Sequence, residues 1–204
     1  MRWWDEHVVP RLVDAMLGND EVGKLRTLAC RGLAGQVLEV GFGSGLNVAH
    51  YPATVTSVSA VEPSDLAWRK AAPRVDAAAV DVRRAGLDGQ RLDLPDASCD
   101  SALTTFTMCT IPDLDAALKE IRRVLKPGGR LHFAEHGLSP DPGVARWQRR
   151  LQPLQGALFA GCQLGRPIAD RVAAAGLEIG DLENFYAPGP RPFGYLYLGW
   201  AATG

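Results

Sequence analysis

The segment at residues 39–45, with the sequence EVGFGSG, places an acidic residue before three glycines at alternate positions. Glycine lets a backbone turn tightly and approach a ligand closely, and a helix that follows such a loop directs free N–H groups toward anions. A short apolar run at residues 36–40 precedes the loop and is typical of a buried strand. A glycine turn alone also occurs in proteins that bind no ligand. A strand before it and a helix after it favour a nucleotide-type binding site.

Glu62 is the second candidate binding residue, because it follows a β-branched run at residues 55–61 and lies 17 residues beyond Gly45. In dinucleotide-binding folds, a carboxylate about 20 residues beyond the glycine loop accepts hydrogen bonds from the ribose hydroxyls. The alternative is an ordinary acid at a strand end, and in both cases we expect Glu62 to be accessible to solvent without a ligand. The dinucleotide pattern G-x-G-x-x-G would require glycine at position 46, where this chain has Leu46. An NAD-dependent oxidoreductase therefore remains an alternative whose glycine pattern fits less well.

The thiols and imidazoles form no metal-binding pattern along the sequence. Cys30, Cys99, Cys109 and Cys162 are separated by 69, 10 and 53 residues, so no CxxC pair exists and we predict no metal site. Cys109 and Cys162 follow a predicted strand and a predicted helix, where each would line an acceptor pocket or serve as a small buried hydrophobic residue. His136 follows another predicted strand and is our candidate general base, with a structural role as the alternative. No partner is visible in the sequence for the remaining histidines, His7, His50 and His132.

Apolar runs and helical patterns alternate along the chain and predict an α/β fold. The predicted parallel strands lie at residues 36–40, 55–61, 77–82, 99–106 and 130–134, and an amphipathic helix lies at 114–125. Predicted helices at 144–159 and 167–175 lead to two further strands, at 177–185 and 195–200, which a Pro/Gly loop joins without a helix. Such a pair is antiparallel. We therefore predict a Rossmann-like, seven-stranded and mostly parallel sheet with one antiparallel edge strand and helices on both faces.

Length and charge exclude several classes of protein. A chain of 204 residues suits one domain, and 22 basic against 23 acidic residues give a net charge of −1, without the basic excess of a nucleic-acid-binding protein. No apolar stretch approaches the roughly 18 residues of a membrane span. We expect a cytoplasmic protein without a nucleic-acid partner or integral membrane association, whose oligomeric state the sequence does not indicate.

Several motifs together resemble the class I S-adenosylmethionine-dependent methyltransferases. They are the glycine loop with its acid, Glu62, the tripeptide Leu87-Asp88-Gly89 upstream of LPDASCD at 94–100, and LKPGG at 125–129. The chain is similar to the "type 11" small-molecule methyltransferase domains over residues 36–136. A narrower resemblance, to a group that includes thiol methyltransferases, rests on Asn47 with Tyr51-Pro52, TMC at 107–109, Glu135-His136 and GCQLGR at 161–166. Animal members of that group begin with a hydrophobic anchor that these residues do not resemble.

The resemblance implies S-adenosylmethionine as cofactor and a role for each matching residue. Gly41, Gly43 and Gly45 would line the methionine end, with Glu39 near its amino group. Glu62 would hold the ribose diol and Asp88 the adenine amino group. Thr105 and Phe106 would face the sulfonium and the acceptor. The implied cofactor-binding set is completed by Asn47, Pro63 and Gly89.

The predicted function is methyl transfer to a small hydrophobic acceptor: a thiol, a phenol or quinone, or a lipid-like molecule. The sulfonium is already activated by its charge, so the enzyme mainly orients the acceptor and excludes water. His136 would serve as the base if the acceptor arrives protonated. Because such an enzyme needs no single indispensable residue, a non-catalytic cofactor-binding protein stays an alternative. A nucleic-acid methyltransferase is a weaker one, since neither an N/D-P-P-Y/F/W motif nor a Pro-Cys nucleophile is present.

We predict a single methyltransferase domain over residues 1–204. It would comprise an N-terminal helical cover at 1–31, a cofactor-binding core at 36–136, and C-terminal helices with the antiparallel strand pair at 137–204. The cover is expected to lie over the acceptor site and outside the folded core. Its apolar side would consist of Trp3, Trp4, Val8, Leu12 and Met16.

Overall fold

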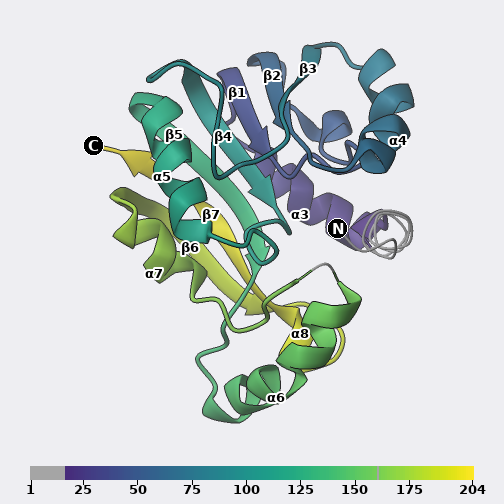
Figure 1. Cartoon of the computed structure of the whole chain (residues 1–204), viewed down its shortest axis with the longest axis vertical. Coiled ribbons are helices and arrows are strands. Elements are labelled where there is room, and N and C mark those ends of the chain that lie inside the picture. The colour runs from purple at the N-terminus through teal and green to yellow at the C-terminus, as the bar shows by residue number, and fades with distance from the viewer. Residues whose placement is uncertain (1–16, 160) are drawn as a thin grey trace.

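The computed structural model describes residues 17–159 and 161–204, and its centre is one seven-stranded sheet (Figure 1). The strand order is β3-β2-β1-β4-β5-β7-β6, with every neighbouring pair from β3 to β5 parallel and both pairs of β7 antiparallel. The predicted fold class is confirmed. The antiparallel strand is inserted between β5 and β6, so β6 forms the edge. The strands are β1 (Gly35–Val40), β2 (Val55–Val61), β3 (Asp81–Gly86), β4 (Cys99–Thr105), β5 (Leu125–His136), β6 (Leu177–Tyr186) and β7 (Tyr195–Thr203).

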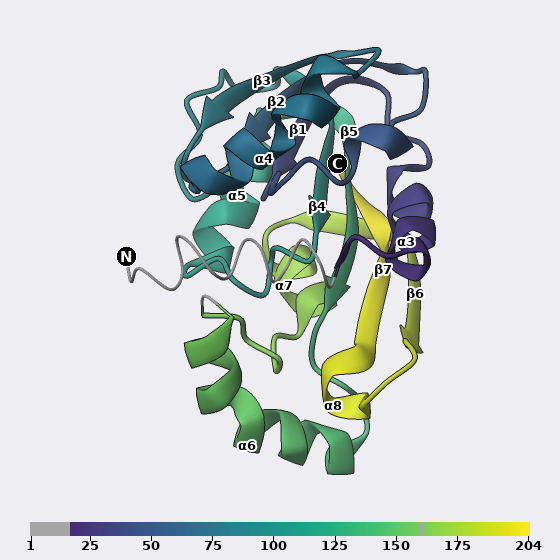
Figure 2. The ribbon, with the colours of Figure 1, turned by 90° about the vertical axis from the view of Figure 1, so that its right-hand side faces the viewer.

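Helices cover both faces of the sheet, and a hydrophobic core lies under each set (Figures 1 and 2). One core joins the sheet to α5 (Leu114–Val124) and α7 (Ile168–Ala174), and the other joins it to α3 (Asp20–Cys30) and α4 (Asp65–Asp76). The helices α6 (Pro142–Leu158) and α8 (Arg191–Gly194) lie beyond the carboxyl end of β5. In the described part of the chain, no helix has the length and apolar character needed to cross a bilayer.

The amphipathic helix expected at 114–125 is α5, and its boundaries have simple causes. The Asp113 carboxylate accepts a hydrogen bond from the Ala116 N–H at 3.0 Å and so caps the first turn. The apolar positions recur every three or four residues and all face the sheet. The buried residues of α5 are Leu114, Ala117, Leu118, Ile121 and Val124.

The third strand lies four residues later than its predicted start at residue 77. The helix α4 extends to Asp76, and β3 covers Asp81–Gly86 with Arg83 and Arg84 within it. β3 is an edge strand, and edge strands carry charged residues because only one side of the strand is paired. The apolar run that marks the central strands is therefore missing here. The pattern placed the strand start over residues 77–80, which form the turn and bend between α4 and β3.

The expectation of an N-terminal cover outside the core is wrong for residues 20–30. These residues form α3, and its Ala29 and Cys30 are buried in the core cluster on that face of the sheet. The side chains of the expected apolar stripe, from Trp3 to Met16, lie outside the described residues. A helix that fills part of the core contributes to folding, whatever else it covers.

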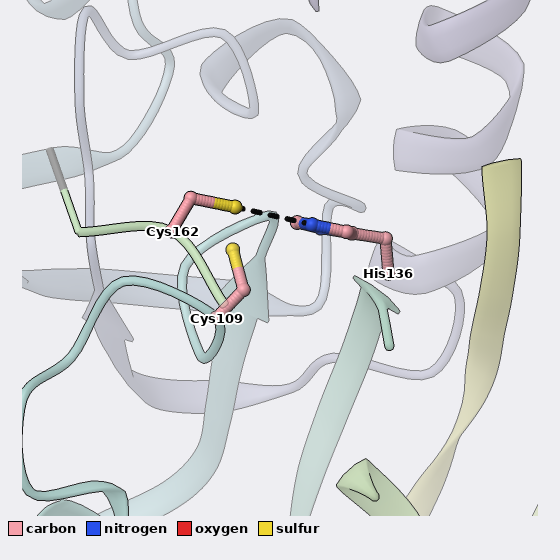
Figure 3. A group of neighbouring side chains, drawn as sticks. All are labelled: Cys109, His136 and Cys162. Carbon is pink, nitrogen blue, oxygen red and sulfur yellow. Dashed lines mark hydrogen bonds between the residues drawn. The ribbon is translucent and has the colours of Figure 1, made fainter. Parts of the chain in front are cut away.

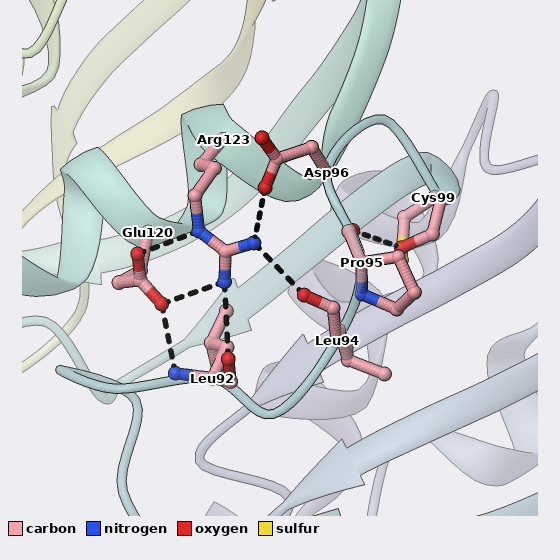
Figure 4. A network of polar contacts seen from close by, with 8 residues as sticks. Leu92, Leu94, Pro95, Asp96, Cys99, Glu120 and Arg123 are labelled. Atoms are coloured by element: carbon pink, nitrogen blue, oxygen red, sulfur yellow. Dashed lines mark hydrogen bonds and ion pairs between the residues drawn. The ribbon is translucent and has the colours of Figure 1, made fainter.

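Arg123 on α5 fixes the loop between β3 and β4 (Figure 4). Its guanidinium donates to the backbone carbonyls of Leu92 and Leu94 at 3.0 and 2.8 Å and pairs with Asp96 at 2.6 Å. Glu120 accepts from Arg123 at 2.7 Å and from the Leu92 N–H at 2.9 Å, and the guanidinium lowers the pKa of Glu120 to about 2. This loop begins beside Asp88, so the network positions a candidate binding residue.

Replacing Arg123 with methionine removes the guanidinium hydrogen bonds that join α5 to this loop. We expect Arg123→Met to lower the free energy of unfolding by about 1–3 kcal/mol, because two carbonyls and two carboxylates lose a charged donor. Denaturant titration measures the change. Arg122→Met, at the exposed neighbour on the same helix, is the matched control. An equal loss of unfolding free energy in the two variants would show that the Arg123 hydrogen bonds do not stabilise the loop.

Candidate cofactor and acceptor site

The glycine loop follows β1 directly and requires glycine for two reasons. Gly41, Gly43 and Gly45 all have positive φ, at 79°, 60° and 76°. A Cβ at Gly41 would lie 2.1 Å from the Thr107 hydroxyl oxygen, whereas a Cβ at Gly43 would meet nothing within 4 Å. Gly41 is therefore needed for close packing, and the loop at Gly43 borders open space that a ligand can enter.

The helix after the loop differs from the expectation. Instead of an α-helix, a single 3-10 turn, η1 (Val48–His50), follows and ends before Tyr51-Pro52. Proline disfavours helical backbone in the residue before it, which explains why the turn does not continue. The predicted contribution of a helix dipole to anion binding is therefore absent here. The N–H groups of the loop are already hydrogen-bonded within the protein, at Gly41, Phe42, Gly43 and Gly45.

Glu62 is buried, with 6% of its surface exposed, and it supports the loop. One carboxylate oxygen accepts from the Gly43 N–H at 2.7 Å and the other from the Ser64 N–H at 2.7 Å. Burial raises the pKa of the Glu62 carboxyl. The expectation that it is solvent-accessible without ligand is wrong, because its two oxygens bind the backbone of Gly43 in the glycine loop and of Ser64, the N-cap of α4.

A network of buried polar side chains lies beside the loop. The Glu39 carboxylate accepts from the Asn47 amide at 2.9 Å and from the Tyr51 hydroxyl. Arg26 of α3 donates at 2.8 Å to the Asn47 carbonyl oxygen and at 2.8 Å to the Thr105 hydroxyl. The network links the ends of β1 and β4 to α3.

Arg26 is a candidate site residue that sequence analysis missed. It is 5% exposed, and its Nε has no hydrogen-bond partner among the described residues. The guanidinium also lies 5.6 Å from the centroid of the Phe106 ring. Its helix shows no motif in sequence, so only its tertiary position indicates this role.

The loop after β3 brings Asp88 and Gly89 to the same edge of the sheet. A Cβ at Gly89 would lie 2.6 Å from Val40 Cγ1, so this glycine lets the loop pack on the end of β1. Asp88 is exposed, and its Oδ1 accepts from both the backbone N–H and the side-chain amide of Gln90 at 2.9 Å. The structure therefore places Asp88 near the glycine loop. Gln90 fixes the carboxylate through its Oδ1 oxygen.

The turn after β4 is held by a buried carboxylate on the next strand. Glu135 is fully buried and accepts from the Thr107 N–H at 2.8 Å and the Met108 N–H at 3.1 Å. Phe106, which begins this turn, has a positive φ of 54° and donates its N–H to the Ala134 carbonyl at 2.9 Å. Burial raises the pKa of the Glu135 carboxyl to about 7, and the two backbone donors oppose this shift.

Cys109, His136 and Cys162 meet at the carboxyl ends of β4 and β5 (Figure 3). Cys162 Sγ lies 3.1 Å from His136 Nε2, and the three side-chain atoms lie within 4.8 Å of one another. Hydrogen bonds from Cys109 and His136 lower the pKa of the Cys162 thiol, while the same contact raises the pKa of Cys109. The sequence indicated separate roles for these residues, because 26 or more positions separate each pair.

The family model described as "Methyltransferase domain" matches residues 38–133, which run from β1 into β5 and contain the glycine loop, Glu62 and Asp88. The chain belongs to the class I S-adenosylmethionine-dependent methyltransferases. S-adenosylmethionine is accordingly the cofactor of this methyltransferase.

Comparisons with individual proteins support the same family. The chain is 36% identical over 107 residues to the thiol S-methyltransferase TMT1B of Rattus norvegicus, covering 52% of this chain and 42% of that protein. It is 58% identical over 43 residues to the ubiquinone/menaquinone biosynthesis C-methyltransferase UbiE of Caulobacter sp. strain K31, covering 21% and 17%. The matches thus span less than half of these relatives' own lengths.

Among solved structures, an S-adenosylmethionine-dependent methyltransferase of Thermotoga maritima, described as a possible histamine N-methyltransferase, has the same fold. The TM-score is 0.67 at 21% identity, over 97% of this chain and 99% of that one. At this identity the similarity supports the fold of this methyltransferase and not its substrate.

The buried carboxyl of Glu39 predicts how stability depends on pH. Burial raises its pKa from 4.5 to about 7. Between these values the folded state retains a proton that the unfolded state has lost, so stability falls as pH rises, by up to about 1.4 kcal/mol per unit. The Glu135 carboxyl, whose pKa burial also raises, makes stability fall with rising pH in the same way. We expect Glu39→Gln to make the decline between pH 5 and 7 shallower, as measured by urea denaturation. Glu178→Gln, at an exposed acid on β6, should leave the slope unchanged. An unchanged slope in Glu39→Gln would contradict the assignment.

Proposed function

We propose that this methyltransferase transfers the methyl group of S-adenosylmethionine to a small apolar thiol. The observation that carries the acceptor side of this proposal is the position of His136. Its imidazole lies at the carboxyl end of β5, and the neighbouring strand β4 ends at Thr105, with Phe106 next. The similarity to a thiol S-methyltransferase over half of the chain supports the same acceptor class.

The proposed cofactor site follows the edge of the sheet from β3 to β4. Asp88 and Gly89 would bind the adenine end, and Glu62 with Pro63 the ribose. Gly41, Gly43, Gly45 and the Glu39–Asn47 pair would bind the methionine end, with Thr105 and Phe106 beside the methyl group. What supports this assignment is the open space at Gly43 and the order in which these residues occur along the edge.

The proposed reaction is an in-line displacement. The acceptor loses its thiol proton to His136 or to water, and its sulfur then forms a bond to the methyl carbon. The bond from that carbon to the sulfonium breaks, and its electron pair stays on the sulfonium sulfur, which leaves neutral S-adenosylhomocysteine. A thiol has a pKa near 8.5, so a small part is already ionised at neutral pH and little base catalysis is needed. The protein's contribution is orientation and exclusion of water.

A quinone-type acceptor is the second candidate, and the match to UbiE favours it. The identity to the Caulobacter protein is 58% over 43 residues, and a UbiE of Syntrophotalea carbinolica is 32% identical over 158 residues, covering 74% of this chain and 65% of that protein. Carbon methylation of a phenolic ring requires removal of protons from groups less acidic than a thiol, and His136 Nε2 is already hydrogen-bonded to Cys162. This geometry favours a thiol acceptor, because a thiol is deprotonated with less help from a base than a phenolic ring is.

A methyl-transfer screen distinguishes these acceptors. The full chain is incubated with methyl-labelled S-adenosylmethionine and either short alkyl thiols, phenols, quinols or primary amines. We expect label in the thioether product of the alkyl thiols, with turnover at least about tenfold above that of any phenol or amine. Transfer to a quinol alone would establish the second candidate, and transfer to none of them would contradict both.

Glu62 provides a test of the cofactor site. We expect Glu62→Gln to weaken S-adenosylhomocysteine binding at least about tenfold, because hydrogen bonds to a charged group contribute about 1.5–3 kcal/mol. The free energy of unfolding should also fall by about 1–3 kcal/mol, since one of the Gly43 and Ser64 N–H groups loses its acceptor.

Calorimetry measures the binding, and urea denaturation measures the stability. Glu183→Gln, at an exposed acid on β6, is the control. Tight binding of NADH by the unmodified chain, without heat from S-adenosylhomocysteine, would contradict the proposed site. An unchanged dissociation constant for S-adenosylhomocysteine in folded Glu62→Gln would show that Glu62 is not part of the cofactor site.

A further inference from the structure

We propose that Cys109, His136 and Cys162 form a binding site for one zinc ion, with an open fourth position. The three residues come from the turn after β4, the end of β5 and the turn after α6. Their sulfur and nitrogen atoms converge on one point (Figure 3). Thiolate and imidazole are the ligands that zinc prefers over harder oxygen donors, and the harder cations Mg²⁺ and Ca²⁺ prefer oxygen.

The spacing of the ligand atoms suits a tetrahedral ion. Bonds of about 2.3 Å from zinc to sulfur and about 2.0–2.1 Å to nitrogen place neighbouring ligand atoms about 3.6–3.8 Å apart. Cys162 Sγ and His136 Nε2 are separated by 3.1 Å, and every pair of the three atoms lies within 4.8 Å. Shifts of a few tenths of an ångström at each flexible side chain are therefore sufficient.

The backbone that carries the ligands is held in place by further hydrogen bonds. The Gln163 N–H donates to the Cys109 carbonyl at 2.9 Å and so ties the two cysteine turns together. Gln152 of α6 donates to the Cys162 carbonyl at 2.9 Å, and Arg166 donates to the carbonyl of Met108. Both cysteines are buried, at 2% and 4% exposure. A site fixed in this way loses little conformational freedom on binding a metal.

The charges also balance. Two thiolates and a neutral imidazole around Zn²⁺ give a site without net charge, which the buried position requires. Three protein ligands with a free fourth position are typical of catalytic zinc sites, whereas structural sites have four protein ligands.

The open position would face the acceptor side proposed above. Cys109 follows Phe106 by three residues, and its Sγ lies 3.9 Å from the Phe106 carbonyl oxygen. The role of that position rests on the proposed function: it would bind the acceptor thiol as a thiolate, with the thiol proton released to water. His136 then acts as a ligand and not as the general base.

Zinc binding is tested on the full chain, reduced and freed of metal with a chelator, without cofactor or acceptor. Equilibrium dialysis against zinc chloride should give one ion per chain, and cobalt chloride should give sulfur-to-cobalt charge-transfer absorption. Loss of an outer-shell partner weakens metal sites 10–100-fold, so loss of a ligand in Cys109→Ser or Cys162→Ser should cost about 100-fold or more. Cys99→Ser, at the opposite end of β4, should bind as the unmodified chain does. Circular dichroism confirms that each variant is folded.

Several outcomes would overturn the zinc site. They are substoichiometric binding, equal affinity in folded Cys109→Ser, and a Cys109–Cys162 disulfide that persists under reduction and prevents binding. Methyl-transfer assays are separate. Zinc binding without any thiol methylation would remove the proposed function and leave the site. Equal thiol methylation with zinc removed would remove the role of the open position and leave the proposed function.

Discussion

The parallel pairing of β1 with β2 on one side and β4 on the other is the constraint on which the site depends. Val40, the last residue of β1, pairs with Val61 of β2 and with Thr104 of β4. The next residue on each strand, Gly41, Glu62 or Thr105, therefore emerges at one level of the same edge. Parallel strands end together, so segments that are distant in sequence deliver their loops to one place without any contact between those loops having to form first.

Once the strands are aligned, buried polar groups fix the loops. Glu62 holds Gly43 and Ser64, Glu135 holds Thr107 and Met108, and Glu39 holds Asn47 and Tyr51. Burying a carboxylate is costly unless hydrogen bonds compensate; burial raises the pKa of all three carboxyls, and their hydrogen bonds oppose the shift. Positively charged ligands benefit from such groups. The sulfonium and ammonium groups of S-adenosylmethionine therefore suit the site proposed above, where the three buried acids lie along the edge of the sheet.

The proposed acceptor side differs in chemistry from the proposed cofactor side. It is built by the turn after β4, the end of β5 and the turn after α6, and it presents sulfur and imidazole instead of carboxylates. The two sides meet at Phe106, whose backbone N–H is fixed to β5 and whose ring lies near Arg26. The positive φ of Phe106 is costly for an aromatic residue, and strain of this kind concentrates at functional sites. The proposed site thus joins a cofactor half on the loops after β1, β2 and β3 to an acceptor half in which the turn after β4 and the end of β5 meet the turn after α6.

The sequence by itself determined the sheet, because a buried strand such as β2 requires a continuous apolar run and α5 requires a stripe every three or four residues. It also determined the glycine loop, since a backbone with positive φ and close packing excludes other residues. It misplaced β3, an edge strand without that apolar signal, and it missed α3 as part of the core. Only the tertiary structure decided the burial of Glu62, the entry of Arg26 into the site and the meeting of Cys109, His136 and Cys162. These depend on which side chains the strand order brings together, and contacts between separate elements leave no periodic pattern in the chain.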